Sequence, residues 1–234
     1  MNIRIRKTIV PLLAAILSSQ SVCTAQSQIT GKDTTLHQNQ TTVELSPGLL
    51  NSVESKDVTR EGNPQTIDSP HGKAASFDGV RDGLFIHSNP IENLRQFTIE
   101  LFFFPAPQGP HEQRFFHIGE VSGSRLLLET RVTDDQWYLD AFIKSGDSSR
   151  TLIDQKLTHP TGRWFHLAFV VDNGTMDTYV DGEHELNGRV DFTPLNGGMM
   201  ALGVRMNKVS WFKGAIARIR ITPSCLQPAG FMKQ

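Results

Sequence analysis

The chain has 234 residues and a formal net charge of −1 at pH 7, from 23 Lys and Arg against 24 Asp and Glu. This balance argues against a surface for nucleic acid or anionic membranes, because either would need a basic face. There are two cysteines, Cys23 and Cys225, so the fold is expected to rest on a hydrophobic core and not on a disulfide framework.

Residues 1–25 have the pattern of an export signal. Three basic residues stand within the first seven, residues 8–17 are apolar, and small residues at Cys23 and Ala25 predict cleavage after Ala25. The apolar run is shorter than the roughly 20 residues of a spanning helix, so no membrane insertion of the mature chain is expected. We expect an exported protein that is periplasmic, on the cell surface or secreted. A lipoprotein anchored at Cys23 is less favoured, because "QSV" before it lacks the usual pattern.

Residues 26–45 are expected to form a flexible leader. Up to about residue 42 the sequence "QSQITGKDTTLHQNQTT" is rich in Gln, Thr and Asn and has no aromatic residue. Such a segment buries too little apolar surface to offset the entropy lost on ordering. A single folded domain is expected over residues 46–225, with a C-terminal tail over residues 226–234. Once the signal is removed, Cys225 has no partner within the chain.

From about residue 58, short runs of alternating apolar and polar residues recur at intervals of about ten residues. Gly, Pro, Asn and Asp separate these runs, and no segment has a convincing helical period. In "FTIELFFFP" the alternation places Phe97, Ile99, Leu101 and Phe103 on one face of a strand. Many short strands separated by turn residues predict an all-β, antiparallel sandwich or barrel.

Two of these strands, "RLLLETRV" and "WYLDAFIKS", flank a turn at "TDDQ". If this turn closes a hairpin, Glu129 lies opposite Asp140 and Arg131 lies opposite Tyr138 on one face. Trp137 then falls on the other face, toward the core. Two opposed carboxylates cost stability unless Arg131 compensates. The cluster is therefore either a solvated structural ion cluster, a ligand-binding site or a catalytic pair.

A second hairpin is predicted in "RWFHLAFVVDNGTMDTYVDGEHE", residues 163–185. Asn173 and Gly174 form a strong hairpin-turn signal, and Asp181 and Gly182 form another. His166 is flanked by apolar residues on a strand, where a histidine is usually a hydrogen-bonded structural residue. We interpret this stretch as hairpin architecture and not as a catalytic centre.

Four stretches, in this order, resemble the laminin-G-like family of concanavalin A-like jelly rolls in its bacterial secreted branch. They are "GKAASFDGVRDGLFI", "FTIELFFFP", "GRWFHLAFVVDNGTMDTYVDGE" and "ALGVRMNKVSWFKGAIARIRI", and the resemblance spans residues 72–222. It implies a jelly-roll β-sandwich in which Trp164 and His166 are scaffold positions. It does not specify a function, because the family includes sugar binders, adhesion modules and domains attached to polysaccharide-degrading enzymes.

The favoured function is that of a non-catalytic, lectin-like module that binds a glycan or a glycosylated surface. Acids and basic groups would take sugar hydroxyls, and an exposed aromatic side chain would stack on the sugar ring. Trp137 and Trp164 are expected in the core, whereas Trp211 lies in a polar stretch and is expected at the surface. The candidate carbohydrate-binding residues are Glu129, Arg131, Tyr138, Asp140 and Trp211.

Two other function classes stay open. A glycan hydrolase or lyase would use Glu129 and Asp140, although the Glu-x-Asp-x-Glu motif of jelly-roll glucanases does not occur here. A structural or adhesion module would bind a protein partner through a sheet edge or face. The two classes differ in what they require: a cleft with converging acids for the enzyme, and a broad apolar patch for the module.

No cofactor is required by these patterns, and calcium is left open. Asp78, Asp82 and Asp181 could contribute oxygen ligands, yet each stands in an Asp-Gly turn that favours Asp for backbone reasons alone. The eight histidines are scattered without zinc-binding spacing.

Overall fold

A computed structural model describes residues 41–52 and 54–233. The predicted signal, Cys23 and most of the predicted leader lie outside the described residues. Within the described part of the chain, no helix is long and apolar enough to cross a membrane. The predicted export signal and the predicted localisation therefore stay predictions.

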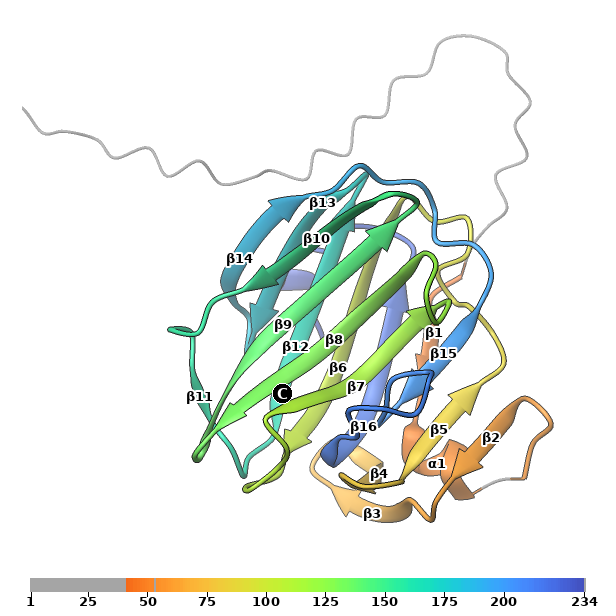
Figure 1. Ribbon diagram of the computed structural model, residues 1–234, viewed down its shortest axis with the longest axis vertical. Helices are drawn as coiled ribbons and strands as arrows, with labels where there is room; N and C mark the ends of the chain where they lie inside the picture. Colours follow the sequence, from red (N-terminus) through yellow and green to blue (C-terminus); the bar gives the residue numbers. More distant parts are fainter. Residues whose placement is uncertain (1–40, 53, 234) are drawn as a thin grey trace, which may run out of the picture. The chain divides into compact units, whose positions relative to one another are not determined.

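Two antiparallel β-sheets pack face to face, which confirms the predicted all-β sandwich (Figure 1). In sheet A the strands follow the order β14 (Glu183–Arg189), β13 (Thr175–Val180), β12 (Phe165–Asp172), β6 (Gln96–Pro105), β16 (Lys213–Thr222), β4 (Gly72–Asp78) and β3 (Gln65–Ser69), and β1 (Val43–Leu45) pairs with β16. In sheet B the order is β10 (Ser148–Ile153), β9 (Gln136–Ser145), β8 (Arg125–Thr133), β7 (Glu112–Gly119), β15 (Met199–Leu202), β5 (Gly83–Ile86) and β2 (Val58–Glu61), and β11 (His159–Pro160) pairs with β9.

The main core lies between the sheets and follows the predicted alternation. Phe97, Ile99, Leu101 and Phe103 of β6 are all fully buried in it, together with Trp137 of β9. Fully burying one such side chain contributes roughly 1.5–3 kcal/mol, so this layer is the main source of stability of the described fold.

The predicted hairpin turns are present, with the backbone geometry that their residues favour. Asn173 and Gly174 have φ angles of 47° and 93°, and Asp181 and Gly182 have φ angles of 51° and 85°. Consecutive positive φ angles are the signature of the turn that matches the twist of paired strands. The turn between β8 and β9 also has a positive φ, 55° at Asp134.

The outer face of sheet A is covered by the end of the chain. Phe231 packs with Ala168 and Val170, and Met232 packs with Phe102. A short 3₁₀ helix, η1 (Pro228–Gly230), precedes these two residues. The part of the outer face of sheet A that carries Phe102, Ala168 and Val170 is therefore occupied by the chain itself.

A buried polar cluster fastens this C-terminal segment to sheet A. Glu100 is fully buried and accepts hydrogen bonds from the backbone N–H of Met232 at 2.6 Å and from Arg220 Nε at 2.6 Å. His166 Nε2 lies 3.2 Å from Glu100 Oε1, the oxygen that also accepts the N–H of Met232. Burial would raise the pKa of Glu100, but hydrogen bonds from His166, Met232 and Arg220 outweigh burial and lower that pKa. His166 thus has the structural role expected from the sequence.

Three further positions extend or correct the sequence interpretation. Strand β1 takes up residues 43–45, the last three residues assigned to the leader, and pairs them with Ile219, Arg220 and Ile221. A short helix, α1 (Pro47–Ser52), follows it. Trp164 was expected in the core, but it lies half-buried on the outer side of sheet A against Phe104.

Candidate functional site

The outer face of sheet B presents the cluster predicted from the β8–β9 hairpin. Glu129 pairs with Asp140 and Arg131 pairs with Tyr138 in the observed register. Strand β7 adds the residues that sequence reasoning missed, because Arg114 pairs with Glu129 and Glu112 pairs with Arg131. Figure 1 shows β7, β8 and β9 side by side, with sheet B in front of sheet A.

Two arginines bridge three carboxylates in this cluster. Arg131 Nη2 donates to Asp140 Oδ2 at 2.5 Å and to Glu129 Oε2 at 3.2 Å, and Arg114 Nε donates to Glu129 Oε1 at 2.8 Å. Both arginines also donate to Glu112, and Arg114 donates to the hydroxyl of Ser210. Every carboxylate is thus bonded to a guanidinium, which compensates the opposed acids as the sequence required.

The carboxyl groups of the cluster differ strongly in acidity. Burial raises the pKa of Glu129 to about 7, and the negative charge of Asp140 acts in the same direction against the two arginines. Glu112 is more exposed, and hydrogen bonds from Arg131 and Arg114 outweigh its partial burial and lower its pKa to about 2. A strongly raised pKa in a surface pocket is typical of a functional site, although ion-pair networks also produce it.

A shallow pocket of about 210 Å³ opens directly over this network. Its charged lining comprises Glu129, Asp140 and four arginines, which are Arg114, Arg125, Arg131 and Arg205. Leu127 and Phe142, paired with each other across β8 and β9, supply an apolar part of the wall. The pocket therefore combines fixed hydrogen-bonding groups with a small apolar surface, and most of its lining is charged.

The structure brings three of the five predicted site residues together in the pocket wall, and two lie outside it. Glu129, Arg131 and Asp140 line the pocket. Tyr138 shares their face but is buried, with 7% of its surface exposed, so it offers little area for stacking. Trp211 is half-buried beside Phe85 in a separate cluster. The aromatic side chain at the pocket is Phe142, which the sequence analysis did not select.

A buried histidine lies beside Leu127 of the pocket wall. His117 of β7 pairs with Leu127 of β8, and its Nδ1 accepts the backbone N–H of Met206 at 3.1 Å. Its Nε2 therefore carries the proton and donates to the Glu120 carbonyl oxygen at 3.1 Å. Burial lowers the pKa of His117 to about 4, and the nearby charges of Arg205 and Arg125 act in the same direction.

The aspartates considered for calcium are engaged in turns and local contacts. Asp78 Oδ1 accepts the backbone N–H groups of three following residues, and Asp82 accepts those of Asn63 and Asp78. Asp181 accepts the N–H of His166 and pairs with Arg163. In residues 41–52 and 54–233, no group of three or more His, Cys, Asp or Glu side chains is arranged to hold a metal ion.

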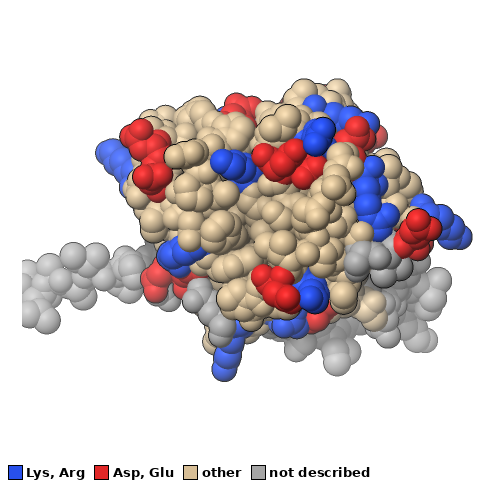
Figure 2. Space-filling model, turned by 90° about the horizontal axis from the view of Figure 1, so that it is seen from below, with Lys and Arg blue, Asp and Glu red and all other residues tan. Residues whose placement is uncertain are grey.

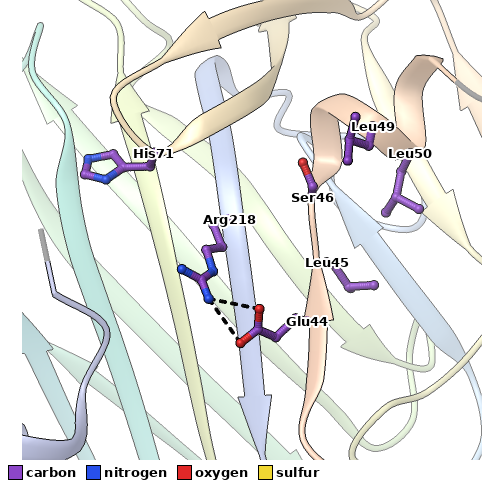
Figure 3. A pocket seen from close by; sticks show the side chains of 7 residues that line it. All are labelled: Glu44, Leu45, Ser46, Leu49, Leu50, His71 and Arg218. Atoms are coloured by element: carbon purple, nitrogen blue, oxygen red, sulfur yellow. Dashed lines mark hydrogen bonds and ion pairs between the residues drawn. The ribbon is translucent and has the colours of Figure 1, made fainter.

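A larger pocket of about 390 Å³ lies at β1, α1 and β16 (Figure 3). Its wall is mainly apolar, with Leu45, Leu49 and Leu50. Its two charged groups bind each other, because Arg218 Nη2 donates to both carboxylate oxygens of Glu44 at 2.9 and 3.1 Å. This pocket therefore presents fewer charged groups to a polar ligand than the pocket of sheet B.

Charge on another side of the molecule is mixed in sign. Figure 2 shows acidic and basic side chains next to one another in small groups, separated by uncharged surface. This view contains no continuous basic stripe of the kind that binds nucleic acid.

Comparison with known proteins agrees with this fold. Residues 78–230 match the Laminin_G_3 family model, described as the concanavalin A-like lectin/glucanases superfamily, and the chain belongs to this family. The resemblance seen in the sequence is thereby confirmed. No curated protein matches the chain.

Several solved structures share the sandwich at low sequence identity. One is domain 4 of AbnA, a GH43 extracellular arabinanase from Geobacillus stearothermophilus, in complex with arabinotriose. It has a TM-score of 0.58 and 24% identity, and the match covers 80% of this chain and 84% of that one. Another is the binding domain of botulinum neurotoxin DC in complex with SialylT, with a TM-score of 0.53 and 15% identity over 74% of this chain. The match spans only 44% of that toxin domain. At these identities the similarity shows the fold alone.

Proposed function

We propose that this chain is an exported, non-catalytic carbohydrate-binding module whose site is the pocket on the outer face of sheet B. The observation that carries the proposal is the composition of that pocket. Carboxylate and guanidinium groups, fixed by mutual ion pairs, stand beside the apolar side chains of Leu127 and Phe142.

Sugars suit such a wall because each ring combines hydroxyl groups with an apolar C–H face. Carboxylates accept hydrogen bonds from hydroxyls, and guanidinium groups donate to them in a fixed plane. Because the ion pairs already hold Glu129, Arg131 and Asp140, little side-chain entropy remains to be lost on binding. Phe142 offers the C–H face an aromatic contact that Tyr138 is too buried to provide.

A further observation supports a glycan ligand. The arabinanase domain and the neurotoxin binding domain, which share this fold, were solved with arabinotriose and with SialylT.

A catalytic role for Glu129 and Asp140 is the second candidate, and the raised pKa of Glu129 favours it. A glycosidase needs a carboxyl group on each side of the scissile bond, at least about 5 Å apart. Here Arg131 Nη2 occupies the space between the two carboxyl groups and is bonded to both. This arrangement favours binding over hydrolysis.

The test is a glycan-array screen of the full chain, secreted through its own signal, with calcium and with chelator. We expect binding that Phe142→Ala weakens at least about tenfold, because this variant removes the aromatic contact. Phe104→Ala, at a half-buried aromatic residue on sheet A, is the matched control and retains binding. Binding that requires calcium would move the site to the Asp-Gly turns, and no binding to any glycan would overturn the proposal.

A further inference from the structure

We propose that the ligand of this pocket carries a negative charge, as a uronic acid carboxylate or a sulfate ester, and that Arg125 and Arg205 bind it. The inference rests on the proposed function and specifies its ligand class. It starts from a difference among the four arginines that line the pocket.

Arg125 and Arg205 are not ion-paired, unlike Arg114 and Arg131. Within the described part of the chain, neither forms a salt bridge. Arg125 Nη1 donates to the carbonyl oxygens of Ser122 and Gly123 at 3.0 and 2.8 Å, and Arg205 Nη2 donates to that of Val121 at 3.1 Å. Both guanidinium groups are therefore held in place by backbone carbonyls while their charge remains uncompensated.

The surroundings make this lack of compensation costly. The Nε atoms of Arg125 and Arg205 are buried and have no hydrogen-bond partner in the described structure. Lys144 lies directly opposite Arg125 in the β8–β9 register, and like charges in that position destabilise a sheet. An anion bound beside Arg125 and Arg205 would supply the missing opposite charge and the missing hydrogen-bond acceptors.

The charged groups at the pocket carry a net positive charge, which favours an anionic ligand. Glu112, Glu129 and Asp140 already compensate Arg114 and Arg131. These three carboxylates carry one more charge than the two arginines, so only part of the charge of Arg125, Arg205 and the neighbouring Lys144 is left as a net positive excess beside the pocket. A carboxylate or sulfate can accept two parallel hydrogen bonds from a guanidinium, which an uncharged hydroxyl cannot.

Arg125 and Arg205 lie next to the apolar wall of the pocket, which Leu127 and Phe142 form and against which a sugar ring would rest. The guanidinium of Arg125 lies over the Phe142 ring in a cation–π contact, 5.1 Å from the ring centre, so a sugar at this wall would meet the cation and the ring together. His117, held neutral, accepts the N–H of Met206, the residue after Arg205, and so fixes the loop that carries this arginine. An acidic group on a sugar ring seated against Phe142 would thus be within reach of a pre-positioned cation.

The experiment has two parts. The first compares binding of acidic oligosaccharides with that of the same oligosaccharides after carboxyl reduction or desulfation, for wild type, Arg125→Gln, Arg205→Gln and Arg95→Gln. Arg95 is an exposed arginine before β6 and controls for the lost charge. The second follows the Arg Nε–H signals by NMR while sodium sulfate or glucuronate is added at constant ionic strength.

We expect acidic oligosaccharides to bind roughly 10- to 100-fold more tightly than their neutral counterparts. The preference is expected to disappear in Arg125→Gln and Arg205→Gln and to persist in Arg95→Gln. Sulfate and glucuronate are expected to shift the Nε–H signals of Arg125 and Arg205 saturably. Retention of the preference in both pocket variants would overturn the inference.

Failure of this inference can be told apart from failure of the proposed function. Equal binding of neutral and acidic glycans, lost in Phe142→Ala, would overturn the inference and leave the proposed function standing. No binding of either kind of glycan would overturn both. Absence of a saturable shift with sulfate and with glucuronate would exclude the anion site whatever the array shows.

Discussion

Glu129 and Asp140 face each other across β8 and β9, and both accept a hydrogen bond from the same nitrogen, Nη2 of Arg131. Two opposed carboxylates are tolerated here because one guanidinium lies between them. Because of this arrangement, the free energy of unfolding depends on whether Glu129 is ionised.

The stability of the wild type is expected to depend on the ionisation of Glu129. Its pKa is raised to about 7 in the folded state from 4.5, so the folded chain holds this proton more tightly than the unfolded chain. The contribution of Glu129 to the free energy of unfolding therefore falls as pH rises from about 4.5 to about 7. The loss is on the order of 3 kcal/mol.

Glu129→Gln removes this titration, and urea unfolding of both proteins between pH 4 and pH 8 measures the difference. We expect the wild type to lose stability relative to the variant as pH rises across this range. Other titrating groups occur in both proteins, so most of their effects cancel in the comparison. Parallel stability curves would show that Glu129 titrates normally.

His117 is expected to stay neutral well below the usual histidine range. Its pKa is lowered to about 4, because the ring is buried and the nearby arginines repel a positive charge. NMR of the imidazole nitrogens should show an unchanged Nε2–H tautomer from pH 8 to about pH 5. Protonation of the His117 ring in the ordinary histidine range, near pH 6.5, would contradict the prediction.

Glu100→Ala is expected to lower the free energy of unfolding by about 3–5 kcal/mol, because it leaves a partly buried Arg220 without its partner. Hydrogen exchange should also increase at Met232, whose N–H loses its acceptor. Glu44→Ala is the matched control, since its ion pair with Arg218 is exposed and contributes less than about 1 kcal/mol. Equal effects of the two substitutions would argue against the fastening role of Glu100.

Gly174→Ala and Gly182→Ala separate backbone strain from steric contact at the two turns of the β12–β14 region. Both glycines have positive φ, so each substitution should cost about 1–2 kcal/mol of strain. A Cβ at residue 174 would also lie 2.2 Å from the Val190 carbonyl oxygen, whereas nothing lies within 4 Å at residue 182. Thermal unfolding should therefore show Gly174→Ala to be the less stable by a further 1–3 kcal/mol or so. Equal melting temperatures would exclude the contact.

The local alternation of apolar and polar residues and the turn residues were enough to predict the fold. They also predicted three of the six charged residues that line the pocket, Glu129, Arg131 and Asp140. The alternation in β6 and the turn residues at positions 134, 173 and 174 determine which side chains face the core. The short turn after β8 also sets the register, so the opposition of Glu129 and Asp140 followed from the sequence. These features depend on neighbours within about ten residues of one another.

The remainder of the site depends on long-range pairing, which the pattern does not specify. Arg114 reaches Glu129 through a β-bulge between Arg114 and Phe116 that interrupts the alternation of β7. Arg205 comes from the loop after β15, a strand far along the chain that pairs with β7. The same limit explains why Trp164 was wrongly expected in the core. It packs in the cluster on the outer face of sheet A that includes Met232, and the sequence pattern does not show that the C-terminal segment covers this face.

The two ends of the described chain are both attached to sheet A. Strand β1 joins β16 within that sheet, and Met232 packs on its outer face. A protein immobilised on a sensor surface through a tag at its C-terminus is therefore anchored on the side of sheet A. The pocket of sheet B would then face the flowing solution, so immobilised protein should keep its full ligand capacity without any redesign of the attachment point.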